Sequence, residues 1–131
     1  MTEWLVLAPE PESPRAARSF VVHWLRTWDY GCLVDPVALV TSELASNTVR
    51  HAGETFTVGV EDLGHGIRVS VQDPVRTPPV PRTATESDVS GRGMGIVDAL
   101  SDAWGTEQIP AGKVVWCTFA ATERHPAFAT S

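Results

Sequence analysis

A glycine-rich run carries the clearest chemical signal in this sequence. Gly91, Gly93 and Gly95 alternate with Arg92 and Met94 directly before the apolar residues of a predicted helix. Glycines at a helix start leave backbone N–H groups unobstructed at the positive end of the helix dipole, and such a site suits phosphate. A flexible loop followed by a glycine-rich helix start is the alternative interpretation of the same run.

Two common phosphate-binding motifs do not fit this chain. A dinucleotide-binding fingerprint needs a third glycine where the chain has Ile96, and it must follow a strand directly. A P-loop needs Gly-Lys-Ser/Thr before a helix, whereas Gly112-Lys113 is followed by Val114 and no helix. The glycine-rich run therefore has to be interpreted together with other residues.

Three polar side chains accompany the run. Glu43 and Asn47 are four residues apart on a predicted helix, so both project from one face, at the border of its apolar stripe. Asp73 stands where a predicted strand stops, and ligand-binding side chains are often presented at strand ends. Each residue alone is more typical of a solvated or turn position. Their conjunction in chain order with the glycine-rich run is what indicates a site.

Two amphipathic helices are predicted to position Glu43 and Asn47. Ser13-Pro14 and Asp35-Pro36 each place a capping residue before a proline at the first helical position. The first helix ends at residues 29–31 and the second near Ala52 and Gly53. Apolar residues recur three and four positions apart in both helices, which indicates one buried face on each.

Strands account for most of the remaining chain. The apolar period changes to two over Phe56–Val60 and Ile67–Val71, which predicts an antiparallel hairpin joined by residues 63–66. Trp4–Ala8 predicts a first strand, and Trp104–Ile109 with Lys113–Ala121 predicts a closing hairpin.

A long polar loop is predicted over Asp73–Ser90, which contains four prolines, followed by a third helix over Ile96–Asp102. The apolar face expected for that helix includes Leu100 and Ala103. The resulting order predicts an α+β fold, a two-layer sandwich in which helices cover one face of a mixed, mostly antiparallel sheet.

Composition bounds the class of protein. The chain has 131 residues, 43% of them hydrophobic, which predicts one domain over residues 1–122 and a frayed tail over 123–131. A formal net charge of −6 disfavours direct nucleic-acid binding. The two cysteines show no CxxC pairing, and the chain has neither a signal-peptide pattern nor a membrane-length apolar run, so we expect a cytoplasmic protein with no membrane contact.

Four segments together resemble the gyrase, heat-shock chaperone, histidine kinase and MutL (GHKL) ATPase superfamily. They are TSELASNTVRHAG, the region of Asp73, GRGMGIVDALSDAWG and GKVVW, which look like its N box, its two glycine boxes and its terminal strand. The resemblance is closest to small bacterial anti-sigma-factor serine/threonine kinases and their stand-alone ATP-binding relatives. It covers about Leu39 to Trp116.

The resemblance implies ATP and Mg²⁺ as cofactors and gives each polar residue a role. Asn47 would help to hold a Mg²⁺ ion that bridges the nucleotide phosphates, and Glu43 would be the general base. Asp73 would accept a hydrogen bond from the adenine amino group, selecting ATP over GTP. Arg50 and His51, one turn beyond Asn47, would face either the phosphates or solvent.

The glycine-rich run receives its role from the same resemblance. The backbone of Gly91, Gly93, Met94 and Gly95 would wrap the phosphates, and Arg92 would reach the γ-phosphate when the segment closes as a lid.

The expected function is an ATP-dependent serine/threonine kinase that phosphorylates an anti-anti-sigma (STAS-type) protein and sequesters a sigma factor. Homodimers are common among the proteins it resembles. A non-catalytic binding module of the same fold is the alternative, favoured by the prolines after Asp73 and by Val114, where relatives often have an assisting threonine. A nucleotide-independent structural protein is a third, weaker hypothesis.

Overall fold

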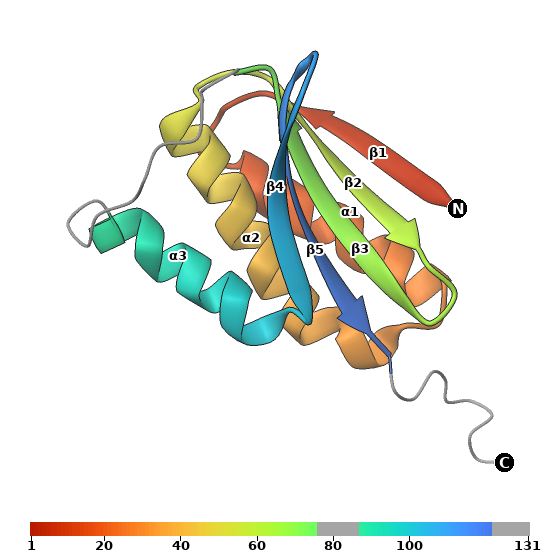
Figure 1. Cartoon of the computed structure of the whole chain (residues 1–131). Helices are drawn as coiled ribbons and strands as arrows, with labels where there is room; N and C mark the ends of the chain where they lie inside the picture. Colours follow the sequence, from red (N-terminus) through yellow and green to blue (C-terminus); the bar gives the residue numbers. More distant parts are fainter. Residues whose placement is uncertain (76–86, 122–131) are drawn as a thin grey trace, which may run out of the picture.

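The computed structural model describes residues 1–75 and 87–121, with side chains omitted for residues 87–93. Figure 1 shows helices layered on one side of a sheet. The elements are β1 (Thr2–Leu7), α1 (Ser13–Thr27), a 3-10 turn η1 (Gly31–Leu33), α2 (Val34–His51), β2 (Phe56–Asp62), β3 (Gly66–Asp73), α3 (Ser87–Leu100), β4 (Ala103–Ile109) and β5 (Gly112–Ala120).

The sheet has the strand order β1-β2-β3-β5-β4. All four neighbouring pairs are antiparallel, so the expected mixed sheet contains no parallel pair among the described strands. The reason is that β4 takes the edge position, which brings β5 back beside β3 in the opposite direction. The predicted α+β two-layer sandwich, with both hairpins and the first strand, is confirmed.

Strand alternation separates a buried face from an open one. The inward positions of the central strands are almost completely buried and include Val58, Val60, Val69 and Val71. Outward positions across the same strands carry Thr57, Gln72 and other polar residues at intermediate exposure. This alternation is what a sheet covered on one face requires.

The predicted amphipathic character of α1 and α2 is confirmed. Ala17, Val21 and Leu25 of α1 are fully buried, as are Val37 and Val40 of α2. Figure 1 shows α2 between α1 and α3 over the sheet. No helix within the described residues combines the length and apolar character that a membrane span requires.

The predicted side-chain caps of these two helices are wrong. The Ser13 hydroxyl donates to the Ala8 carbonyl instead, and α1 begins at Ser13 itself, which moves Pro14 into the second position. Asp35 lies inside the first turn of α2, because η1 leads directly into that helix and leaves Leu33 at its N-cap. Asp35 still lies near the positive end of the helix dipole.

The third helix begins earlier than predicted. It starts at Ser87, so the polar loop predicted over Asp73–Ser90 is shorter, and residues 76–86 of it lie outside the described part of the chain. Gly91–Gly95 consequently lies within α3 and not ahead of it. Glycine can adopt both helix and loop conformations, and in a helix it is less favourable than alanine by about 1 kcal/mol per residue. The packing of α3 on α2 can therefore decide between the two conformations.

The end of α3 also differs from the prediction. The helix stops at Leu100, whose side chain is 39% exposed and not part of the buried face. Asp102 pairs with β5 instead: its backbone N–H donates to the Thr118 carbonyl at 2.9 Å, and its carboxylate accepts from the Ala120 N–H. These bonds place Asp102 and Ala103 at the start of β4. The predicted tail over residues 123–131 lies outside the described part of the chain.

Gly66 allows β3 and β5 to approach closely. A Cβ atom built on it would lie 2.2 Å from the Phe119 carbonyl oxygen and 2.9 Å from the Ala120 Cα. Both are backbone atoms of the neighbouring strand, so no side-chain rotation relieves the clash.

We expect Gly66→Ala to lower the free energy of unfolding by about 2 kcal/mol or more, because the two strands must separate locally. The denaturant midpoint, followed by tryptophan fluorescence, measures the loss. Gly31→Ala is the matched control, since a Cβ atom there meets nothing within 4 Å. Equal losses in the two variants would contradict the steric explanation.

A buried thiol makes the free energy of unfolding depend on pH in the alkaline range. Cys117 is fully buried, and desolvation raises the pKa of its thiol from 9.0 to about 12. The stabilisation from the neutral thiol is complete below pH 9.0 and is lost as the pH rises toward about 12. We expect Cys117→Val to flatten the fall in unfolding free energy across that window, and an unchanged pH profile would count against this assignment.

Candidate functional site

Helix α2 presents Glu43 and Asn47 at the edge of its buried stripe. Both side chains have intermediate exposure, whereas the neighbouring residues Leu44 and Thr48 are buried beneath the helix. The carboxylate and the amide therefore lie one turn apart, beside the core and open to ligands. This is the placement that the sequence pattern predicts.

Asn47 connects α2 to α3 and accepts a hydrogen bond from an arginine. Its Nδ2 donates to the Met94 sulfur on α3 at 3.9 Å, a long contact to a weak acceptor. Its Oδ1 accepts a hydrogen bond from Arg50 Nη2 at 2.6 Å. Arg50 is exposed, as one of its two expected positions requires, and its guanidinium also turns back onto Asn47. His51 is exposed.

Asp73 ends β3 and is only 3% exposed. Its Oδ1 accepts a hydrogen bond from the Val75 N–H at 2.9 Å, the turn-type bond expected of an aspartate at a strand end. Figure 1 places the end of β3 at the same end of the molecule as the last turn of α2. Asp73 is thus a buried acceptor next to the segment that leads toward α3.

Gly112 supports Asp73 from the neighbouring strand. It has φ +147°, and a Cβ atom there would lie 2.0 Å from the Asp73 carbonyl oxygen and 2.6 Å from the Pro74 Cα. Only a glycine lets β5 start this close to the end of β3. Gly112 lies between the two strands of the predicted closing hairpin, and no local sequence signal indicates this contact with a candidate site residue.

The glycine-rich run reaches the site through α3. Met94 is half-buried and touches Asn47, and Gly95 is exposed. Gly91, Arg92 and Gly93 lie within the bounds of the same helix, and their side chains are outside the description. The structure therefore brings the glycine-rich run together with Asn47, and the backbone of that run is helical and not a phosphate-wrapping loop.

The donor set suits Mg²⁺ more than a transition metal. Asn47 Oδ1 already accepts a hydrogen bond from a cationic group. It is an amide oxygen, and Mg²⁺ prefers oxygen ligands. Among the described side chains, those of residues 1–75 and 94–121, no three His, Cys, Asp or Glu gather at one place, so a Mg²⁺ ion held here would take its remaining ligands from phosphates and water.

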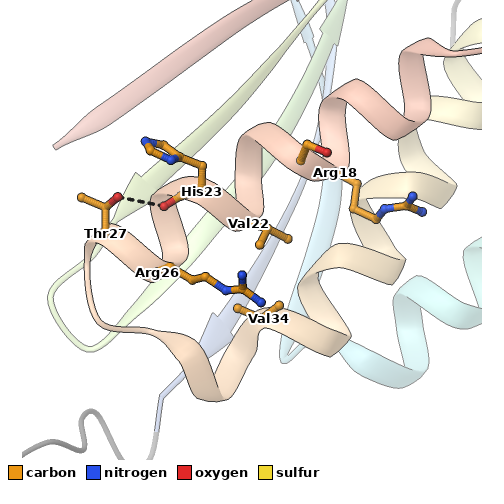
Figure 2. Close-up of a pocket in the computed structure, with 7 residues that line it drawn as sticks. Arg18, Val22, His23, Arg26, Thr27 and Val34 are labelled. Atoms are coloured by element: carbon orange, nitrogen blue, oxygen red, sulfur yellow. Dashed lines mark hydrogen bonds between the residues drawn. The ribbon is translucent and has the colours of Figure 1, made fainter.

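A shallow groove lies elsewhere on the molecule, along α1 and the start of α2 (Figure 2). It is lined by Arg18, Ser19, Val22, His23, Arg26, Thr27 and Val34. None of the candidate nucleotide residues contributes to it. The signal that could have indicated it is the sequence of α1, which contains three arginines and no acidic residue.

Known proteins resemble this chain along most of its length. A family model for the histidine kinase-like ATPase domain matches residues 7–119. An uncharacterized protein of Streptomyces coelicolor is 37% identical over an alignment of 82 residues, and the match covers 58% of this chain and 77% of that protein.

A solved structure supports the same architecture. The RsbU and RsbW domains of Rv1364c from Mycobacterium tuberculosis match with a TM-score of 0.68 and 18% identity, over 92% of this chain and 32% of that one. The chain thus spans about a third of that protein, and the likeness concerns the fold. Because the family model also covers most of the chain, the predicted superfamily is confirmed, and this protein belongs to the family of histidine kinase-like ATPase domains.

Proposed function

We propose that this protein binds Mg-ATP and transfers the γ-phosphoryl group to a serine or threonine of a regulatory protein partner. One observation carries the proposal: α2 presents Glu43 and Asn47 side by side, and Asn47 contacts Met94 of the glycine-rich run. Membership of the histidine kinase-like ATPase family indicates that the nucleotide is ATP. A carboxylate next to a phosphate site supplies what phosphoryl transfer to a hydroxyl needs from a protein, namely positioning and a proton acceptor.

In the proposed reaction Glu43 orients the attacking hydroxyl and accepts its proton. Asn47 contributes its amide oxygen to the cation site. Arg50 donates to that oxygen in the structure, so it has to leave before a cation binds. Because Arg50 lies one turn from Asn47, its guanidinium would then still be close enough to face the phosphate charge. A bound Mg²⁺ would neutralise phosphate charge. Arg92 and the backbone of Gly91, Gly93 and Gly95 form the proposed lid.

Asp73 is the proposed adenine-reading residue. Its carboxylate is buried and accepts hydrogen bonds, so it complements the exocyclic amino group of adenine. Guanine carries a carbonyl at the corresponding position and would leave the carboxylate facing another acceptor. Burial makes that mismatch costly.

The proposed partner is an anti-anti-sigma (STAS-type) protein that carries the acceptor hydroxyl, with a sigma factor as a second binding partner and a homodimer as the assembly. Support comes from the resemblance of the boxes and from the likeness to a structure that contains an RsbW domain. A binding module without phosphotransfer is the second candidate, favoured by the helical conformation of Gly91–Gly95.

We expect calorimetric titration to detect Mg²⁺-dependent binding of ATP and no comparable binding of GTP. Asp73→Asn should weaken ATP binding by about tenfold or more, because the amide leaves one hydrogen bond to the base mismatched. Glu107→Gln, an exposed acidic residue of β4, is the control and should leave the affinity unchanged. Equal binding of ATP and GTP would contradict the role of Asp73, and no binding of either would contradict the proposed function.

We expect Glu43→Gln to lower the rate of phosphotransfer to the acceptor protein by about 10²- to 10⁴-fold, because the amide cannot take the proton. ATP affinity should stay within about twofold, since the change keeps size and removes no phosphate contact. Glu54→Gln, on the exposed segment after α2, is the matched control. A wild-type protein that binds ATP and partner without transfer would favour the non-catalytic module.

A further inference from the structure

The groove on α1 combines two cations with an apolar floor. Arg18, Val22 and Arg26 are four residues apart in succession, so they form one stripe along the helix. Figure 2 shows Arg26 and Val22 extending toward Val34 at the start of α2. The two arginines are exposed, and both valines are half-buried. The surface therefore alternates charge, apolar contact and charge over two helical turns, about 12 Å.

The charges of this stripe are not neutralised by α1 itself. The helix contains three arginines and no Asp or Glu, in a chain with a formal net charge of −6. Among the described residues, the salt bridge of the structure joins Arg68 to Glu61 on the sheet and involves neither Arg18 nor Arg26. A carboxylate brought to either guanidinium could form a charge-assisted, bidentate pair.

The stripe also contacts α2, the helix that carries Glu43. Arg18 Nη1 donates to the Ser42 hydroxyl at 3.3 Å, and Ser42 directly precedes Glu43 on α2. Successive residues of a helix point about 100° apart, so a segment lying along the groove would reach α2 on the side that faces α1, whereas Glu43 points from a different side of the same helix.

We propose that the groove formed by Arg18, Val22, Arg26 and Val34 is the docking surface for an acidic amphipathic helix of the protein partner. Two carboxylates about two turns apart would pair with Arg18 and Arg26, and an apolar residue between them would contact Val22 and Val34. Docking there would hold the partner against α2, the helix that carries Glu43, during phosphotransfer. That last role rests on the proposed kinase function, whereas the binding of the helix does not.

The test uses a fluorescent synthetic helical peptide in which Glu, Leu and Glu recur four residues apart, and a second peptide with Lys in place of Glu. Fluorescence anisotropy without nucleotide measures binding to the full chain. We expect the acidic peptide to bind at least about tenfold more tightly than the lysine peptide. Its affinity should fall as added salt screens the charges.

Charge reversal locates the binding surface. The double variant Arg18→Glu with Arg26→Glu should lower the affinity for the acidic peptide by about tenfold or more. Arg15→Glu is the matched control, because Arg15 is exposed on the same helix and lies outside the groove, and its effect should stay below about twofold. Thermal unfolding of each variant checks that the fold is retained.

Three results would overturn the proposal: no binding of the acidic peptide at low salt, an equal loss in Arg15→Glu, or tighter, Arg18-dependent binding of a single-stranded DNA oligonucleotide. The last would assign the groove to a phosphate backbone. ATP titrations of the wild-type protein and of Arg26→Glu run in parallel. If the wild-type protein binds the peptide but not ATP, the proposed function alone is rejected. If it binds ATP but not the peptide, the docking surface alone is rejected.

Discussion

The packing of α2 on the centre of the antiparallel sheet is the interaction on which the rest of the structure depends. Val37, Val40 and Leu44 of α2 are almost completely buried, as are Val58 and Val69 of the strands in the same core. Helices α1 and α3 each pack against α2 (Figure 1), so its position decides where both of them lie. Burying this apolar stripe is the term that outweighs the entropy of ordering the helix.

The rotation of α2 about its own axis follows from the same packing. With Leu44 and Thr48 turned to the core, Glu43 and Asn47 must emerge along the border that faces α3. The candidate site is therefore a by-product of how the helix is buried. A small rotation would hide the carboxylate or move Asn47 away from Met94, which explains why a chemically simple site needs a tightly packed support.

One amide connects the separate parts of the site. Asn47 contacts Met94 of the glycine-rich helix through nitrogen and Arg50 through oxygen, so a cation at the oxygen would compete with Arg50 while the nitrogen still contacts α3. Glycines in α3 reduce the helical preference of that segment, so its contacts with α2 contribute to keeping it helical. Ser42 extends the arrangement to α1, since it meets Arg18 one residue before Glu43.

Local pattern by itself determined the helices, the two hairpins, the family resemblance and the placement of Glu43, Asn47 and Asp73. Periodicity of 3.6 or 2 is set by which face must be buried, and this requirement is written in neighbouring residues. Only the tertiary structure decided the edge position of β4, the early start of α3, the replacement of side-chain caps by η1 and by the Ser13–Ala8 bond, and the contact between Arg50 and Asn47. Strand order and helix starts depend on contacts between distant segments, and at Gly91–Gly95 the backbone has no local preference strong enough to choose between helix and loop without them.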